Sequence, residues 1–145
     1  MFITQICGVP VRFEAPVASG LLGQFVAAVS GGSLYRKSSF LLDSLGKTVF
    51  SPNVQINDRP HVRKGLASSP FDDEGVATRT RDIVRNGELQ GYFLGSYSAR
   101  KLGLRSTGHA GGNHNLSMAS TDGDLDALLR KMGTGLLRTD LPGPG

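Results

Sequence analysis

Apolar and polar residues alternate near the beginning of this chain and then recur at helical spacing. From Val9 to Glu14 the order V-P-V-R-F-E places apolar side chains at every second position, which predicts a half-buried strand. Because proline lacks an amide hydrogen, this strand should lie at a sheet edge or begin at the proline. From Val17 the apolar residues follow the i, i+3, i+4 spacing of a helix buried on one side, and Gly31-Gly32 should end that helix. The apolar stripe consists of Leu21, Leu22, Phe25, Val26 and Val29.

The middle of the chain predicts short elements joined by turns. Leu41, Leu42 and Leu45 indicate a short helix that ends at Gly46. Thr48–Pro60 is expected to be a loop with short extended pieces. Between Thr78 and Tyr92, an Asn86-Gly87 pair separates two β-prone runs. Both residues tolerate positive φ, so this pair predicts a β-hairpin.

The last third of the chain predicts one more strand and two helical segments. Ser96–Leu102 should form one or two helical turns. Asp124–Met132 has an apolar stripe and should form an amphipathic helix, capped by Asp122 or Asp124 and ended by Gly133. The following G-L-L-R-T predicts a strand. These elements together indicate an α+β fold, with a mixed or antiparallel sheet and a few short helices.

Composition and charge narrow the class of protein. The 145 residues are 39% hydrophobic and include 20 glycines, which suits a globular domain rich in turns. Lys and Arg outnumber Asp and Glu by 16 to 12, but the basic residues are scattered, so nucleic-acid binding is not favoured. Cys7 is the single cysteine and has no basic neighbour; it excludes an internal disulfide and predicts an unreactive thiol. No apolar run approaches a membrane span, so we expect no membrane association and a cytoplasmic protein.

The segment Ser106–Asn115, S-T-G-H-A-G-G-N-H-N, holds two of the three histidines. Zinc takes four protein ligands in structural sites and three in catalytic ones, whereas His109 and His114 supply only two. His61 is distant, and the carboxylates of Asp72, Asp73 and Glu74 could contribute, although no spacing requires them. The acidic run F-D-D-E-G is more typical of a solvated turn. The alternative for the histidines is a tightly turned loop whose imidazoles hydrogen-bond to the backbone.

Four blocks of this sequence resemble the TldD/PmbA family and, within it, the PmbA (TldE) branch, whose members carry the label "modulator of DNA gyrase". The blocks are G-G-S-L-Y-R-K-S-S-F-L-L-D-S-L-G-K, K-G-L-A-S-S-P-F-D-D-E-G, S-Y-S-A-R-K-L-G-L-R-S-T-G-H-A-G-G-N-H-N and K-M-G-T-G-L-L. The resemblance implies part of the TldD/PmbA C-terminal domain over residues 9–145, preceded by an atypical segment at residues 1–8. Family members extend further on both sides, so we expect a fragment.

The resemblance also implies a function. The family is understood as a heterodimeric zinc metalloprotease, in which TldD carries an H-E-x-x-x-H motif and PmbA/TldE lacks it. Peptide-antibiotic maturation and antitoxin degradation are associated with the complex. In this chain the motif positions fall on Gly23, Gln24 and Ala28, which offer no imidazole and no carboxylate. We therefore expect no catalytic and no metal-binding residue here, with zinc held by a TldD-type partner that acts on peptides or unfolded proteins.

The glycine-rich segment would then line the substrate channel or the subunit interface. The residues predicted to do so are Thr107, Gly108, His109, Gly111, Gly112, Asn113 and His114. Glycine permits close approach of an extended peptide backbone, which supports this assignment. Two alternatives stay open. One is an active metal-dependent peptidase that uses His109, His114 and a carboxylate such as Asp73. The other is a protein that modulates DNA gyrase.

Overall fold

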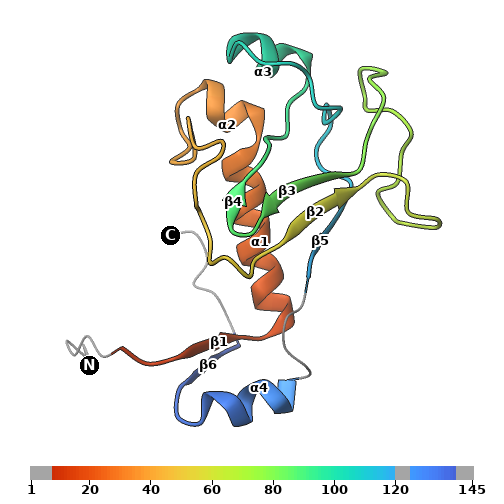
Figure 1. Cartoon of the computed structure of the whole chain (residues 1–145). Helices are drawn as coiled ribbons and strands as arrows, with labels where there is room; N and C mark the ends of the chain where they lie inside the picture. The colour runs from red at the N-terminus through yellow and green to blue at the C-terminus, as the bar shows by residue number, and fades with distance from the viewer. Residues whose placement is uncertain (1–7, 120–124, 140–145) are drawn as a thin grey trace. The chain divides into compact units, whose positions relative to one another are not determined.

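The computed structural model describes residues 8–119 and 125–139, which fall into two compact units (Figure 1). The larger unit takes residues 24–119, and the smaller takes residues 1–23 and 120–145. Most of the atypical segment at residues 1–8, including Cys7, lies outside the described residues, as do the expected caps Asp122 and Asp124. Within residues 8–119 and 125–139, no helix combines the length and apolar composition needed to cross a membrane.

The smaller unit confirms the elements predicted at both ends of the chain. Strand β1, Val11–Phe13, pairs in parallel with β6, Leu136–Arg138. Helix α4, Leu125–Met132, precedes β6 and ends before Gly133, which has a φ of 64°. Because this left-handed conformation carries no steric penalty in glycine, Gly133 ends the helix as expected.

Helix α1, Ala15–Val29, contains the predicted apolar stripe and runs from the smaller unit into the larger one. Phe25 and Val29 are buried, whereas Leu21 is 37% exposed. Pro16 occupies the first turn, where a missing amide hydrogen removes no helical hydrogen bond.

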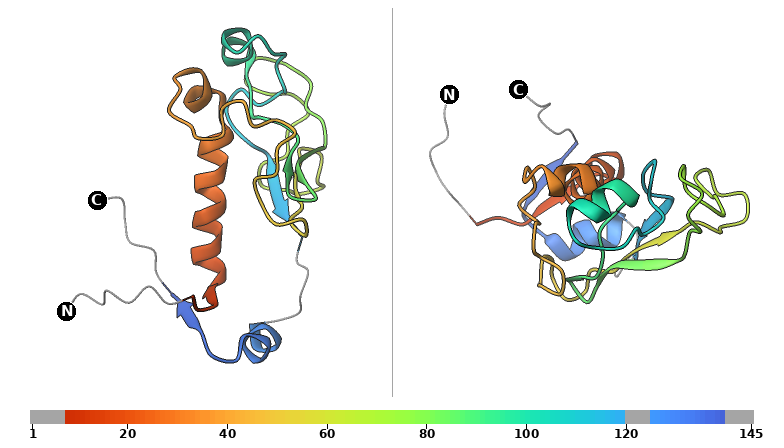
Figure 2. Two further views of the ribbon diagram at one scale, coloured as in Figure 1. Left: turned by 60° about the vertical axis from the view of Figure 1, so that its left-hand side comes forward. Right: turned by 90° about the horizontal axis from the view of Figure 1, so that it is seen from above.

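Gly31-Gly32 does follow the end of α1, but a second helix, rather than a loop, begins there. Helix α2, Gly31–Tyr35, lies beside α3, Ser96–Lys101, in every view (Figures 1 and 2). The Gly31 amide donates to the Phe93 carbonyl over 2.8 Å, and a Cβ on Gly31 would overlap the Ser98 side chain. Glycine is therefore required here by close helix packing.

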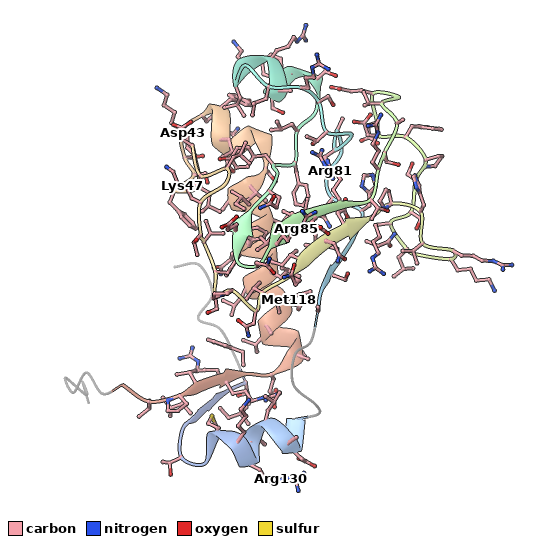
Figure 3. All side chains as sticks on the ribbon, viewed as in Figure 1. Asp43, Lys47, Arg81, Arg85, Met118 and Arg130 are labelled. Atoms are coloured by element: carbon pink, nitrogen blue, oxygen red, sulfur yellow. The ribbon has the colours of Figure 1, made fainter. Side chains whose placement is uncertain are left out.

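The larger unit contains a four-stranded antiparallel sheet in the order β4-β3-β2-β5. The predicted hairpin is confirmed, with Asn86 and Gly87 at φ 50° and 77° as a type I′ turn requires. Side chains of the hairpin strand β3, including Arg81 and Arg85, project from the sheet (Figure 3). The strands are β2, Ile56–Arg59; β3, Arg81–Arg85; β4, Glu88–Leu89; and β5, Asn115–Met118. Helices and an antiparallel sheet together confirm the α+β class.

The helix predicted to end at Gly46 is wrong, because turns occupy that segment. Asp43 has a φ of 56°, which interrupts a right-handed helix. The buried Tyr92 hydroxyl accepts a hydrogen bond from the Ser44 amide at 3.0 Å and donates one to the Leu41 carbonyl at 2.6 Å. A tertiary contact, which local sequence does not reveal, thus satisfies this backbone.

The loop expected over Thr48–Pro60 contains an extended piece, β2, which is a central strand and not a loop margin. Its sequence I-N-D-R has a single apolar residue, so β-propensity is weak. Pairing with strands on both sides establishes it nonetheless, although a bulge at Ile56/Asn57 interrupts its ladder with β3. The core of the larger unit surrounds this sheet and is formed by Phe25, Val29, Leu34, Leu41, Ile56, Ile83, Val84, Leu89, Tyr92, Phe93, Leu94 and Ala99.

Candidate functional site

Strand β2 brings a carboxylate into the interior of the larger unit. Side chains alternate between the two faces of a strand, so Ile56 and Asp58 share the buried face while Arg59 is exposed. Asp58 has no exposed surface at all. A buried carboxylate needs hydrogen-bond donors, and the glycine-rich loop before β5 supplies them.

Both histidines of that loop contact Asp58. His109 Nε2 and His114 Nδ1 each lie 2.9 Å from Asp58 Oδ2, and the His114 amide donates to Oδ1 over 3.0 Å. An ionised carboxylate can only accept, so His109 carries a proton on Nε2 and His114 carries one on Nδ1. The His109 and His114 side chains are only 1% and 9% exposed. The result is a buried His–Asp–His cluster.

Thr107 supports the far side of the His109 ring. Its Oγ1 lies 2.8 Å from His109 Nδ1 and accepts a hydrogen bond from the Leu94 amide at 2.8 Å. The same oxygen lies 3.1 Å from the Tyr92 carbonyl and 3.2 Å from the Leu94 carbonyl. The single hydroxyl proton can therefore point to His109 or to a carbonyl, which lets Thr107 accommodate either tautomer of His109.

Hydrogen bonds determine the charge state of Asp58. Burial alone would raise the pKa of this carboxyl, but the hydrogen bonds and charges of His109 and His114 outweigh burial and hold the pKa below its usual value. Arg81, opposite Asp58 on β3, has its own pKa lowered mainly by burial, while the Asp58 charge acts to raise it. Asp58 is accordingly an anion at neutral pH.

The acidic run beside the cluster is a turn, as predicted, but its first carboxylate is buried. Asp72 is 5% exposed; its Oδ1 accepts the Glu74 and Val76 amides, and its Oδ2 accepts the Ala110 amide. Burial would raise the pKa of Asp72, but these backbone hydrogen bonds hold it below its usual value. Asp72 thus fastens the histidine loop to this turn.

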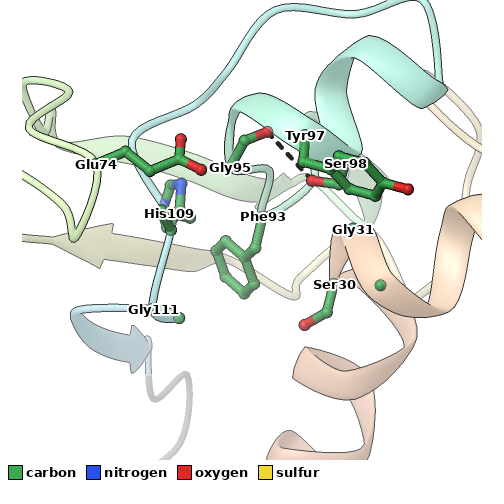
Figure 4. Close-up of a pocket in the computed structure, with 12 residues that line it drawn as sticks. Ser30, Gly31, Glu74, Phe93, Gly95, Tyr97, Ser98, His109 and Gly111 are labelled. Carbon is green, nitrogen blue, oxygen red and sulfur yellow. Dashed lines mark hydrogen bonds between the residues drawn. The ribbon is translucent and has the colours of Figure 1, made fainter.

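A cavity of about 380 Å³ opens on one face of His109 (Figure 4). The Phe93 ring packs against His109 with a centroid separation of 4.7 Å. Glu74 supplies the carboxylate of the wall, and its Oε2 accepts the Ser96 amide at 2.8 Å. Five glycines leave the cavity open where side chains would fill it. The lining residues are Ser30, Gly31, Gly32, Glu74, Phe93, Gly95, Tyr97, Ser98, His109, Ala110, Gly111 and Gly112.

The structure separates the predicted site residues into two groups. His109, Gly111 and Gly112 line the cavity, and these glycines have φ values of 99° and 122°, which other residues rarely adopt. The others stand outside the set of lining residues. Thr107 supports the cluster and His114 belongs to it, Gly108 turns the chain with a φ of 74°, and the Asn113 side-chain amide donates to the His114 carbonyl.

Two expectations for the histidines need correction. Their rings bind a carboxylate and a hydroxyl rather than the backbone, and the carboxylate is Asp58 rather than Asp73. His61 lies apart and contacts Thr78 Oγ1 at 3.0 Å. Sequence reasoning missed Asp58 because it lies 51 and 56 positions from its partners. The available signal was an acidic residue on the same face as Ile56, which becomes visible only when β2 is recognised as a strand.

At the positions where the family resemblance would place the zinc motif, this chain has no side chain that ligates zinc. Gly23, Gln24 and Ala28 lie on α1, where two are exposed and the third is half-buried. A glycine and an alanine offer no lone pair, and an amide is too weak a base to activate water. These residues do not fit a catalytic zinc ion.

Comparison with known proteins identifies the family. The family model for the PmbA/TldA metallopeptidase C-terminal domain matches residues 7–145. A metalloprotease PmbA homologue from Haemophilus influenzae is 59% identical over 94% of this chain, which spans 31% of that relative's length. A TldD homologue from the same organism is 33% identical over 69% of this chain and 21% of its own length.

Solved structures agree with this relationship. A protein described as a putative modulator of DNA gyrase from Bacteroides thetaiotaomicron superposes with a TM-score of 0.85 at 34% identity, covering 92% of this chain and 30% of its own. TldE from Thermococcus kodakarensis superposes with a TM-score of 0.77 at 26% identity, over 94% of this chain and 33% of its own. This chain therefore belongs to the PmbA/TldA metallopeptidase family and corresponds to its C-terminal domain.

Proposed function

We propose that this chain acts as a noncatalytic, PmbA/TldE-type subunit beside a TldD-type subunit that holds the catalytic zinc. The proposal rests on the composition of α1, where Gly23, Gln24 and Ala28 occupy the positions at which the family resemblance would place the zinc motif. The helix is retained while the metal-binding and general-base groups are absent. Such a chain can shape a substrate path or an interface without performing hydrolysis.

The cavity beside His109 supports a role in contacting peptide. The cavity wall has no side chains at Gly95, Gly111 and Gly112, so an extended main chain can approach it closely. The Glu74 carboxylate gives the wall an anionic group that would attract a basic side chain or an amino terminus. The substrates we propose are peptides and unfolded proteins. The family resemblance supports peptide-antibiotic maturation and antitoxin degradation in the cytoplasm as the processes served.

A reconstitution experiment tests the division of labour. Cleavage of an unstructured peptide is measured for this chain, for a TldD-type subunit from the same cell, and for the two together. We expect chelator-sensitive cleavage only when the TldD-type subunit is present, and co-elution of the two subunits. Chelator-sensitive cleavage by this chain alone, abolished by His109→Ala, would instead establish the alternative of an active peptidase based on His109 and His114.

A charge variant tests the role of the cavity. Glu74→Gln should raise the KM of the reconstituted complex for a basic peptide, because it removes the carboxylate while an amide oxygen can still accept the Ser96 amide. Glu88→Gln, on strand β4 and outside the cavity wall, is the control. Equal KM values for both variants would place the peptide elsewhere. Salt-dependent binding of duplex DNA, measured in parallel, would favour the gyrase-related alternative.

A further inference from the structure

We propose that Asp58, His109 and His114 form a binding site for one divalent transition-metal ion, with zinc as the best match. The site uses none of the positions at which the family's zinc motif would lie. It requires no hydrolytic activity of this chain, so it stands or falls separately from the noncatalytic role proposed above. The ion would connect strand β2 to the loop that forms one wall of the cavity.

The geometry of the three ligand atoms carries the proposal. Asp58 Oδ2, His109 Nε2 and His114 Nδ1 all lie within 4.8 Å of one another, and the oxygen is 2.9 Å from each nitrogen. Ligands placed about 2.0–2.1 Å from a tetrahedral zinc ion are roughly 3.3 Å apart. The two hydrogen-bonded distances therefore need to widen by a few tenths of an ångström. The two ring nitrogens, which lie within 4.8 Å of each other, need to reach about the same separation for an ion to replace the shared protons.

In two of the ligands, the polar atom that would not bind the ion already has the hydrogen-bond partner that metal sites require. Metal-bound imidazoles usually donate their second ring hydrogen to an oxygen, and bound carboxylates are themselves hydrogen-bonded. His109 Nδ1 faces Thr107 Oγ1 at 2.8 Å, and Asp58 Oδ1 accepts the His114 amide at 3.0 Å. Thr107 can then turn its own proton to the Tyr92 or Leu94 carbonyl.

The proton balance of binding is straightforward. With neutral rings, the proton of His109 leaves Nε2 and one occupies Nδ1, where Thr107 accepts it. The proton of His114 leaves Nδ1 and one occupies Nε2. Asp58 Oδ2 already accepts hydrogen bonds from both rings and has lone pairs to offer an ion. Each ring therefore changes its tautomer and offers a lone pair, and binding to the cluster with both rings neutral needs no net release of protons.

The chemistry of the donors selects the class of ion. Two imidazoles and one carboxylate suit zinc and its transition-metal neighbours, whereas calcium and magnesium prefer six or more oxygen ligands. A 2+ ion would also place positive charge directly beside the buried Asp58 carboxylate. The nearby Arg81 guanidinium opposes a cation, which predicts an affinity lower than that of an all-anionic site. Three protein ligands leave at least one coordination position for water or another ligand.

Spectroscopy on the tag-free chain tests the proposal directly. The chain is stripped with chelator and titrated with Co²⁺ while the visible absorption is recorded, and bound Zn²⁺ is counted by elemental analysis after dialysis. We expect one equivalent of metal, an intense low-symmetry Co²⁺ absorption band that zinc removes, and no competition from Mg²⁺ or Ca²⁺. Absence of a saturable band, with zinc below one tenth of an equivalent, overturns the proposal.

Variants locate the site. His114→Ala should weaken zinc binding at least tenfold, whereas His61→Ala, which changes the histidine outside the cluster, should bind like the wild type. Thr107→Val should weaken binding about 10–100-fold, because it removes an outer-shell partner while retaining side-chain volume. Equal losses in the His61 and His114 variants would show adventitious binding. If His114→Ala does not fold, the band of the wild type and its retention in His61→Ala decide the question.

Discussion

Asp58 Oδ2 lies 2.9 Å from His114 Nδ1, and 56 positions of sequence separate the two residues. This contact joins the central strand β2 to the end of the glycine-rich loop, and His109, in the middle of that loop, binds the same oxygen. The loop owes its conformation to a buried charge as much as to its glycines. Removal of that charge should therefore affect both stability and the shape of the cavity wall.

Asp58→Ala should lower the free energy of unfolding of the larger unit by about 2–6 kcal/mol, because it leaves two buried ring N–H groups without an acceptor. Urea denaturation followed by circular dichroism measures the change. The control is Asp82→Ala, which removes an exposed ion pair with Arg85 and should cost about 0–1 kcal/mol. Similar losses in the two variants would contradict the structural role assigned to Asp58.

The Asp72 carboxyl should make stability fall in acid. Its pKa is lower in the folded chain than the ordinary value of 3.8, so its contribution is present above that value and is lost as the pH falls through the folded pKa. The difference in unfolding free energy between wild type and Asp72→Asn should therefore be largest near neutral pH and shrink below about pH 4. The control is Asp73→Asn, which changes an exposed neighbour. If the difference in unfolding free energy between wild type and this variant also shrank in acid, this explanation would be refuted.

Gly87 is required for two reasons, a positive φ and close packing, whereas Gly46 has only the positive φ. Both residues have positive φ, at 77° and 75°, but a Cβ on Gly87 would lie 2.6 Å from the Ser51 carbonyl oxygen, while one on Gly46 meets no heavy atom within 4 Å. Gly46→Ala should destabilise by about 1–2 kcal/mol through backbone strain alone. Gly87→Ala should lose about 2–4 kcal/mol, because overpacking adds to the strain. Equal thermal-unfolding losses would exclude the steric contribution.

Tyr92→Phe should destabilise by about 1–3 kcal/mol, because the hydroxyl satisfies the buried Ser44 amide and donates to the Leu41 carbonyl. The faster amide hydrogen exchange expected at Ser44 gives a local readout of the lost hydrogen bond. Tyr97→Phe is the matched control, since Tyr97 is 53% exposed. Unchanged exchange at Ser44 would show that the turn around Asp43 holds without the hydroxyl.

Elements that depend on local patterns were predictable from the sequence. The spacing of Phe25 and Val29 indicated α1, the Asn86-Gly87 pair indicated the hairpin, and Gly133 indicated the end of α4. In each case the physical cause acts over a few residues, through helical periodicity or positive φ. The absence of zinc-motif side chains at Gly23, Gln24 and Ala28 is likewise visible from the sequence and the family resemblance.

Elements that depend on distant partners were not predictable in the same way. Strand β2 has little β-propensity and is held by pairing with β3 and β5. The segment around Asp43 has leucines at helical spacing, yet the Tyr92 hydroxyl holds it as turns. In both places tertiary hydrogen bonds override local preference.

The sequence by itself determined the α+β class, the family, and the presence of two histidines in a glycine-rich loop. Only the tertiary structure decided that Asp58 joins those histidines, that Asp72 fastens their loop through the Ala110 amide, and that His109 borders a cavity. The physical reason is that a buried carboxylate must find donors, and the nearest donors in space come from a loop more than fifty positions away. The spacing of Asp58, His109 and His114 along the chain does not indicate that they are in contact. The pairing of β2 with β5 places Asp58 directly beside the loop.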